Sequence, residues 1–187
     1  MTTYPGKRMF DLAVAGTALA AFAPVIAGIT LAKWLEDRGP PLFPQTRIGR
    51  ARHPFTILKF RSMDKQQQVT RVGRWLRQAG MDELPQFLNV LRGDMSVVGP
   101  RPLTEQDVTR LGLAGPCHDW RFEASPGITG LSQLLAGRGA QASRRLDRLY
   151  LRRQSLPLDL QLIALSFAVN VVGKRGVRRL IQAARKR

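Results

Sequence analysis

A long uncharged run near the N-terminus limits the fold of this chain more than any other feature. Residues 12–32 read LAVAGTALAAFAPVIAGITLA, without one charged side chain. A helix of about 20 apolar residues is long enough to cross the hydrocarbon core of a bilayer. Pro24 lies in the middle of the run, and a proline inside a helix removes a backbone hydrogen bond and clashes with the preceding turn. The sequence therefore predicts a membrane-associated helix with a kink between positions 20 and 24.

Three interpretations of this run stay open. It could be a cleaved signal peptide, because Lys7 and Arg8 precede an apolar stretch that reaches small residues at 21–23. It could be a helix that spans the membrane once. It could also be a re-entrant hairpin that breaks at Ala23 and Pro24, because each half has roughly a dozen residues and would reach only about 18 Å. Basic residues flank both ends and favour the cytoplasmic side for each of them, so we favour the hairpin.

The charge balance indicates a polyanionic partner. The chain has 30 Lys and Arg residues against 13 Asp and Glu residues, a formal net charge of +17. Nucleic acid, anionic phospholipid and phosphorylated substrates all fit this charge. The single cysteine, Cys117, excludes an internal disulfide, and two histidines make a zinc site or a Ser-His-Asp triad unexpected. Any catalysis would therefore use carboxylates and arginines, with or without a bound metal ion.

We expect two units and a mostly helical α+β fold. Residues 1–38 would form the membrane-embedded hairpin, and residues 39–187 a compact cytoplasmic catalytic domain with short strands and amphipathic helices at the membrane interface. Alternating apolar residues predict a strand over 53–60. Helical spacing and end signals predict helices over 71–79 and 143–154.

Two further helices carry functional interpretations. The first would begin at Asp82 as its N-cap, with Pro85 in its first turn. Its buried face would consist of Leu84, Phe87, Leu88 and Leu91, which recur at helical spacing. The second covers residues 174–186, where an apolar stripe is surrounded by basic residues. That pattern is typical of a helix on an anionic membrane surface, and packing on its own domain is the alternative.

Asp82 and Glu83 are the candidate catalytic residues. Neighbours on a helix point about 100° apart, so these carboxylates cannot share a proton as a dyad. At a helix N-terminus, free N–H groups and the positive dipole end keep carboxylates ionised and attract phosphate oxygens. One carboxylate could attack phosphorus while the other holds a hard cation such as Mg²⁺. An isolated Asp-Glu pair is far more often a solvent-facing acidic pair than a catalytic one. The choice between these two interpretations therefore depends on the surrounding residues.

Those surroundings favour phosphate chemistry. Several basic residues lie where prolines, glycines or a strand end fix the backbone, and the planar guanidinium group suits phosphate oxygens. The candidates for substrate binding are Lys59, Arg61, Arg77, Arg101 and Arg138. Arg101 lies between two prolines, and Arg138 lies in a Gly-Arg-Gly turn.

The order of motifs resembles a known family. These motifs are Lys7-Arg8-x-Phe10-Asp11, the break at Pro24, Gln45-x-Arg47-x-Gly49, Lys59-Phe60-Arg61-Ser62-Met63, the acidic motif from Met81 through Pro102, and Pro126-Gly-Ile-Thr-Gly130. Over roughly residues 7–165 the chain is similar to the bacterial sugar transferases, the monotopic polyprenyl-phosphate phosphoglycosyl transferases, in their minimal catalytic form.

The resemblance implies an activity and a location. It implies that the residue matching Asp82 attacks the sugar-linked phosphorus of a nucleoside diphosphate sugar, usually a UDP-sugar, and that the phosphosugar then passes to a polyprenyl phosphate. It implies Mg²⁺ as cofactor, held by Glu83 with Asp82, and basic residues that bind phosphate. It also implies a re-entrant hairpin in the bacterial inner membrane, with the catalytic domain on the cytoplasmic face. An anionic phospholipid membrane, and a homodimer as a further possibility, would be the other partners.

The chain departs from the family pattern in three places, one of which is the loop between Met63 and Arg71, shorter than in many relatives. Ala23 precedes the proline where family members often have serine, so a hydroxyl that could satisfy freed backbone groups is missing. After Gly130 the chain reads LSQLLAGR where relatives commonly carry Trp-Ala-Gln, which affects substrate contacts more than chemistry. A catalytically inactive membrane scaffold and a basic nucleic-acid-binding protein are the alternative functions. A nucleic-acid-binding function would leave the apolar run and the paired carboxylates unexplained. We therefore favour the transferase interpretation, which predicts no nucleic-acid partner.

Overall fold

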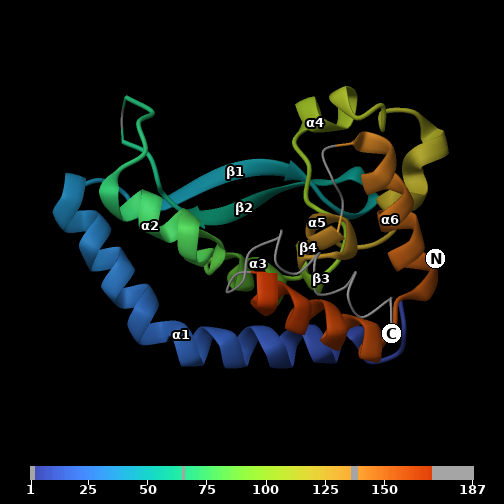
Figure 1. The fold of residues 1–187 in the computed structure, drawn as a ribbon, viewed down its shortest axis with the longest axis horizontal. Coiled ribbons are helices and arrows are strands. Elements are labelled where there is room, and N and C mark those ends of the chain that lie inside the picture. Colours follow the sequence, from blue (N-terminus) through green and yellow to red (C-terminus); the bar gives the residue numbers. More distant parts are fainter. Residues whose placement is uncertain (1–2, 65, 136–138, 170–187) are drawn as a thin grey trace, which may run out of the picture.

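The computed structural model describes residues 3–64, 66–135 and 139–169. Its α-helices are α1 (Lys7–Asp37), α2 (Arg71–Ala79), α3 (Gln86–Arg92), α4 (Glu105–Arg110), α5 (Leu131–Leu135), α6 (Ala140–Arg153) and an unlabelled helix, Leu156–Val169. The strands are β1 (Leu42–Ile48), β2 (Pro54–Phe60), β3 (Ser96–Val98) and β4 (Gly127–Thr129). Short 3₁₀ turns are η1 (Arg50–Arg52), η2 (Met81–Glu83) and η3 (Pro116–Arg121). The mostly helical α+β fold predicted from the sequence is confirmed (Figure 1).

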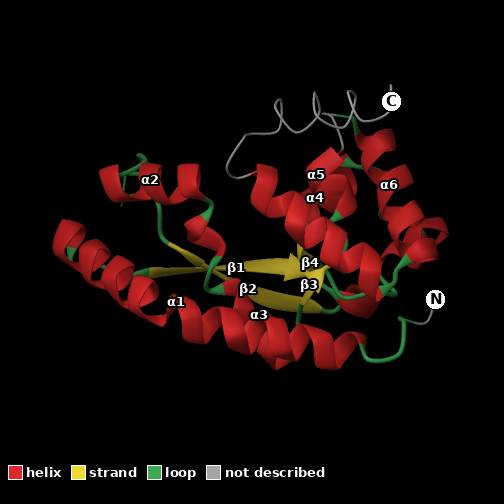
Figure 2. Cartoon of the chain, turned by 60° about the horizontal axis from the view of Figure 1, so that its bottom comes forward, coloured by secondary structure: helices red, strands yellow, loops and turns green. Residues whose placement is uncertain are grey.

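The strands form two small sheets near the middle of the molecule. β1 and β2 pair antiparallel, from Leu42 opposite Phe60 to Ile48 opposite Pro54. β3 and β4 pair in parallel. Figure 2 shows the strands between α1 on one side and α2, α5 and α6 on the other. The predicted strand over 53–60 is therefore confirmed as β2.

Helix α1 contains the uncharged run and is bent. Figure 1 shows that its two halves run in different directions, although the secondary structure stays helical through Pro24. The predicted kink is thus present as a bend in a continuous helix. Among the described residues, α1 is the one helix long and apolar enough to cross a membrane by length and composition. Much of its second half is exposed apolar surface, at Leu31, Trp34 and Leu35.

Buried charges attach the first half of α1 to the rest of the protein. Lys7 Nζ lies 3.0 Å from Asp11 Oδ1 and 2.8 Å from Asp159 Oδ2, and all three side chains are buried. Tyr150 of α6 donates a hydrogen bond to the other oxygen of Asp159, at 2.9 Å. Breaking a buried ion pair strands an uncompensated charge, so this network specifies where α1 docks.

Two expectations for the helix after Gly80 are wrong. Residues Met81–Glu83 form the separate turn η2, and Pro85 rather than Asp82 is the N-cap of α3. The turn arises because Gly80, with φ of 67°, ends α2 in the left-handed conformation and redirects the chain.

The predicted buried face of α3 is wrong in part, because Leu84 and Phe87 pack against hydrophobic clusters but Leu88 and Leu91 do not. Leu88 and Leu91 are 37% and 38% exposed, whereas Asn89 is fully buried. The Asn89 side chain accepts a hydrogen bond from the Leu58 amide at 3.0 Å and donates one to the Thr56 carbonyl at 2.7 Å. These bonds to β2 turn the polar side of α3 inward, a tertiary effect that helical spacing does not reveal.

The remaining helix predictions have mixed outcomes. The helix over 71–79 is confirmed as α2, and the one over 143–154 as α6, which begins at Ala140. Thr70 caps α2 by accepting a hydrogen bond from the Gly73 amide at 3.0 Å. The amphipathic stretch 174–186 lies outside the described residues.

Candidate active site

The two candidate catalytic carboxylates lie in η2, between α2 and α3. Asp82 and Glu83 are both half-buried, at a turn that begins with Gly80. Glu83 Oε1 lies 3.3 Å from Lys59 Nζ, which extends from β2. The sequence prediction that Lys59 stands beside the acidic pair is therefore matched by the geometry.

Asp82 is held in an environment that disfavours its charge. Burial raises the pKa of its carboxyl group, and the neighbouring charge of Glu83 raises it further. Lys59 and Arg77 act in the opposite direction and limit the rise. A carboxylate that is incompletely solvated, yet still balanced by cations, is suited to attack an electrophilic phosphorus.

Arg77 and Arg61 have different positions relative to this pair. Arg77 is near enough for its charge to act on Asp82, and its Nε donates a hydrogen bond to Ser62 Oγ at 2.8 Å. Arg61 follows the last residue of β2 and its amide donates to the Pro41 carbonyl. Its guanidinium group lies against Gly39, where an added Cβ would be 2.7 Å from Nη1. The strand has ended by Arg61, so this side chain turns toward the α1–β1 connection.

A small pocket opens beside Glu83. It occupies about 260 Å³ including its open mouth. Its lining residues come from six separate parts of the chain and are Arg47, Ile57, Lys59, Glu83, Gln86, Arg101, Pro102, Gly127, Ile128 and Gln133. Of the predicted site residues it brings together Lys59, Glu83 and Arg101. Arg138 lies outside the described residues.

The turn that carries Arg101 is fixed by the segment before α5. The Gly99 amide donates to the Thr129 carbonyl at 2.9 Å, and the Gly127 amide donates to the Pro100 carbonyl at 2.9 Å. A Cβ on Gly127 would overlap the backbone nitrogen of Gly99, so the two backbones can approach only with glycine there. The Gly-Pro-Arg-Pro and Pro-Gly-Ile-Thr-Gly motifs therefore act together to place Arg101.

Sequence reasoning missed three polar residues of this pocket. Arg47, Gln86 and Gln133 all line it, from β1, α3 and α5. Arg47 Nη2 donates to Gln45 Oε1 at 2.6 Å, and Nη1 lies 3.6 Å from Asp107 Oδ2. Burial lowers the pKa of Arg47, and the nearby charge of Arg101 lowers it further. Arg47, Gln86 and Gln133 all lie in segments that were singled out from the sequence, but none of those segments indicated a role for these side chains.

The carboxylates can form part of a magnesium site. Among the described residues no group of three or more His, Cys, Asp and Glu side chains is arranged to hold a metal ion. Mg²⁺ often uses only one or two carboxylates and completes its octahedral shell with water and substrate phosphates. Asp82 and Glu83 are adjacent and half-buried, and Glu83 lines the pocket, so the pair fits that mode.

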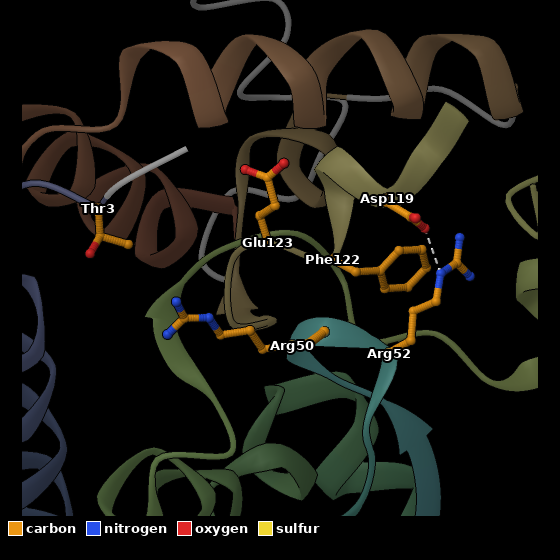
Figure 3. A pocket seen from close by; sticks show the side chains of 7 residues that line it. Thr3, Arg50, Arg52, Asp119, Phe122 and Glu123 are labelled. Atoms are coloured by element: carbon orange, nitrogen blue, oxygen red, sulfur yellow. Dashed lines mark hydrogen bonds and ion pairs between the residues drawn. The ribbon is translucent and has the colours of Figure 1, made fainter. Parts of the chain in front are cut away.

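A larger cavity lies elsewhere and is lined by none of the predicted residues. Thr3, Arg50, Arg52, Asp119, Phe122 and Glu123 surround it in Figure 3, together with Ala51. Arg52 has a structural role there, because its Nε donates to Asp119 at 2.7 Å and its guanidinium group lies 4.2 Å from the centre of the Phe122 ring. We therefore regard the pocket beside Glu83 as the candidate active site.

Known proteins are similar to this chain over most of its length. The family model described as "Bacterial sugar transferase" matches residues 2–173. A UDP-glucose:undecaprenyl-phosphate glucose-1-phosphate transferase from Caulobacter vibrioides is 41% identical over 177 residues, covering 84% of this chain and 66% of the relative. An undecaprenyl-phosphate glucose phosphotransferase from Komagataeibacter xylinus is 41% identical over 186 residues, covering 86% of this chain and 35% of the relative.

A third relative carries another sugar name. A UDP-N-acetylgalactosamine-undecaprenyl-phosphate N-acetylgalactosaminephosphotransferase from Aeromonas hydrophila is 37% identical over 175 residues, covering 84% of this chain and 41% of the relative. The chain thus spans between 35% and 66% of the length of these three relatives.

Proposed function

The chain belongs to the bacterial sugar transferase family, and we propose that it transfers a phosphosugar from a UDP-sugar to undecaprenyl phosphate, with release of UMP. This would be the first membrane step in the assembly of a bacterial glycan. The observation that carries the proposal is the half-buried Asp82, whose pKa is raised by burial and by Glu83, beside a pocket lined with cations. That arrangement supports a nucleophile next to a phosphate site.

The reaction would proceed in two displacements at one phosphorus. A carboxylate oxygen of Asp82 forms a bond to the sugar-linked phosphorus, while the bond from that phosphorus to the bridging oxygen breaks and UMP leaves. An oxygen of undecaprenyl phosphate then bonds to the same phosphorus and displaces Asp82. The product is undecaprenyl diphosphate sugar, and the carboxylate is regenerated.

The cations near Asp82 would stabilise the charge that moves in both steps. Lys59 and Arg101 line the pocket, and Arg77 lies close enough to act on Asp82. Arg61, turned toward Gly39, and Arg138 stay predictions as phosphate-binding residues. Glu83, with Asp82, would hold Mg²⁺, which when bound neutralises charge on the diphosphate.

Contacts at both ends of α1 support the re-entrant topology. Lys7, at its start, is paired with Asp159 of the body. Near its end, Glu36 accepts a hydrogen bond from the Val72 amide at 3.1 Å, and the fully buried Lys33 donates to Thr70 at 3.1 Å. A helix whose two ends both dock on one domain has both ends on that domain's side of the membrane. We therefore favour a hairpin in the inner membrane, with the domain on the cytoplasmic face.

The membrane-surface role follows from charge and exposure. The net charge of +17 would attract anionic phospholipid, and the exposed Trp34 and Leu35 would sit in the interface. A homodimer stays a prediction. Membership of the family removes the main reason for the nucleic-acid interpretation, because phosphorylated substrates and lipids account for the charge.

Release of UMP tests the reaction directly. Full-length protein in detergent would be incubated with Mg²⁺, undecaprenyl phosphate and each of several UDP-sugars, including UDP-glucose and UDP-N-acetylgalactosamine. We expect release from at least one sugar, with loss of more than about a thousandfold in Asp82→Asn, because removing a group that forms the covalent bond leaves only residual catalysis. Glu83→Gln should lose most of the Mg²⁺-dependent UMP release at every Mg²⁺ concentration. Glu105→Gln, which removes an exposed carboxylate from α4, should release UMP at the wild-type rate. Full activity in Asp82→Asn would end the nucleophile assignment.

A further inference from the structure

A buried amide in the pocket lacks a hydrogen-bond partner. Gln86 is 2% exposed and lines the pocket beside Glu83. Within the described part of the chain, no group accepts a hydrogen bond from its Nε2. Nearly all buried polar groups in proteins are hydrogen-bonded, because leaving one unpaired costs its desolvation. An unpaired donor at a pocket wall therefore indicates a ligand that supplies the acceptor.

Arg47, on β1, also has a buried hydrogen-bond donor without a partner in the part of the chain that the structure describes. Its Nη2 and Nη1 are directed to Gln45 and toward Asp107, which fixes the guanidinium group in place. Its Nε is buried and has no hydrogen-bond partner among the described residues. The pocket thus contains two donors, from β1 and α3, that the protein itself does not satisfy.

The charge of the pocket selects the chemistry of the ligand. Arg47, Lys59 and Arg101 line it, against the single carboxylate of Glu83. Arg101 is near enough to Arg47 for its charge to act on that group. Asp107 and Glu83 offset part of the repulsion between Arg47 and Arg101. The lining of the pocket still has three cations against one carboxylate, which favours an anionic ligand. The ligand is therefore an anion with several acceptor oxygens.

The size of the pocket limits which part of a substrate enters it. The enclosed part of the pocket is only about 10 Å³ and the rest of its 260 Å³ is open mouth, so an oxygen of a phosphate group can enter it and a nucleoside cannot. Arg101 and Gln133 also line a neighbouring cavity of about 410 Å³ including open space. That cavity is lined by the polar residues Ser132, Ser143 and Arg144, which can hydrogen-bond a nucleoside or a sugar, and by Leu103, Leu111 and Leu113, which can pack against its ring.

We propose that Gln86 and Arg47 donate hydrogen bonds to the diphosphate of the sugar donor and orient it beside Asp82 and Glu83. The inference rests on the proposed function and adds two binding residues to it. Gln86 begins α3, directly after the turn that carries the carboxylates, so binding energy at Gln86 acts on the position of the phosphate relative to Asp82. The donor's nucleoside or sugar extends from this pocket into the neighbouring cavity.

The test compares Gln86→Met with the matched exposed change Gln106→Met. Methionine has similar volume and removes the unpaired donor, so thermal stability of Gln86→Met should equal or exceed that of the wild type. Titration calorimetry with UDP and Mg²⁺, on full-length protein in detergent, should show binding weakened about 10- to 100-fold, the loss of one hydrogen bond to a charged group. The KM for undecaprenyl phosphate should stay unchanged. Gln106, exposed on α4, should give wild-type values.

Each other outcome has a definite meaning. UDP affinity within twofold of the wild type would overturn the inference, and a lower melting temperature with unchanged affinity would assign Gln86 a structural role. Unchanged UDP binding with a raised KM for undecaprenyl phosphate would assign the pocket to the lipid phosphate instead. If Gln86→Met does not fold, Gln86→Glu keeps the size and adds a charge that repels phosphate, and wild-type UDP affinity in it would equally overturn the inference. Failure of the wild type itself to bind UDP would contradict the proposed function.

Discussion

At the scale of single residues, Asp82, the proposed nucleophile, lies in surroundings that would make a weak nucleophile more reactive. A free aspartate is well solvated and attacks phosphorus slowly. Here partial burial and the neighbouring Glu83 disfavour the charged form of Asp82, whereas the positive charges of Lys59 and Arg77 favour it. The environment therefore exchanges some folding stability for reactivity, as is common at active sites.

This exchange predicts a pH-dependent effect of Asp82→Asn on stability. Because the pKa of Asp82 is raised in the folded state, the native protein loses stability relative to the unfolded chain as pH rises through that pKa. Asparagine has no charge to lose, so the variant should melt at a higher temperature than the wild type at pH 7. The difference should shrink as the pH falls toward the unperturbed value of 3.8.

Thermal unfolding in detergent across this pH range is the measurement. Glu105→Gln, on the exposed face of α4, serves as control and should not show the same trend. A variant Asp82→Asn that is less stable than the wild type at pH 7 would show that the carboxylate stabilises the fold.

At the scale of elements, the sequence predicted part of the local structure. The strand that contains Lys59, the helix after Thr70 and the kinked apolar helix follow from alternation, capping and proline chemistry, which are local. The buried side of α3 does not follow from local signals, because the hydrogen bonds between Asn89 and β2 connect residues far apart in the sequence.

The candidate site divides in the same way. Asp82 and Glu83 could be found because they are adjacent in the sequence, and Arg101 because two prolines fix it. Arg47 and Gln86 could not be found from the sequence. Each is distinguished by a buried hydrogen-bond donor without a partner among the residues that the structure describes, and such a donor exists only after β1 and α3 have packed together. Arg61 was expected at the site because it stands at the end of a strand; it directly follows β2 and its guanidinium group lies against Gly39, so its role in phosphate binding stays a prediction.

Pro24 is predicted to determine the topology of α1. In Pro24→Ala the freed backbone can restore its hydrogen bond and α1 can straighten, which favours one span over a re-entrant hairpin. A cysteine at position 3, in a Cys117→Ser background, reports the side of the membrane that the N-terminus occupies. With Pro24 we expect no labelling of intact cells by an impermeant thiol reagent, and in Pro24→Ala we expect labelling. Labelling with Pro24 in place would mean a single span and would contradict the hairpin.

At the scale of the whole molecule, α1 and the catalytic site are mechanically connected. Both ends of α1 dock on the domain through buried charged side chains, Lys7 at the start and Lys33 near the end. The carboxylate turn η2 follows directly from α2, whose first turn receives Glu36 of α1. Such an arrangement would keep the site at a constant depth relative to the membrane, where a lipid phosphate must reach it.

The central claim is that one aspartate carries the phosphosugar between two substrates. The most direct test omits undecaprenyl phosphate and follows exchange of uridine-labelled UMP into the UDP-sugar that the wild type uses, with Mg²⁺ present. A covalent intermediate on Asp82 predicts exchange in the wild type, because labelled UMP can reverse the first displacement, and none in Asp82→Asn. Turnover with undecaprenyl phosphate but no exchange without it would indicate direct transfer, and exchange that persists in Asp82→Asn would place the nucleophile elsewhere; either result would contradict the account.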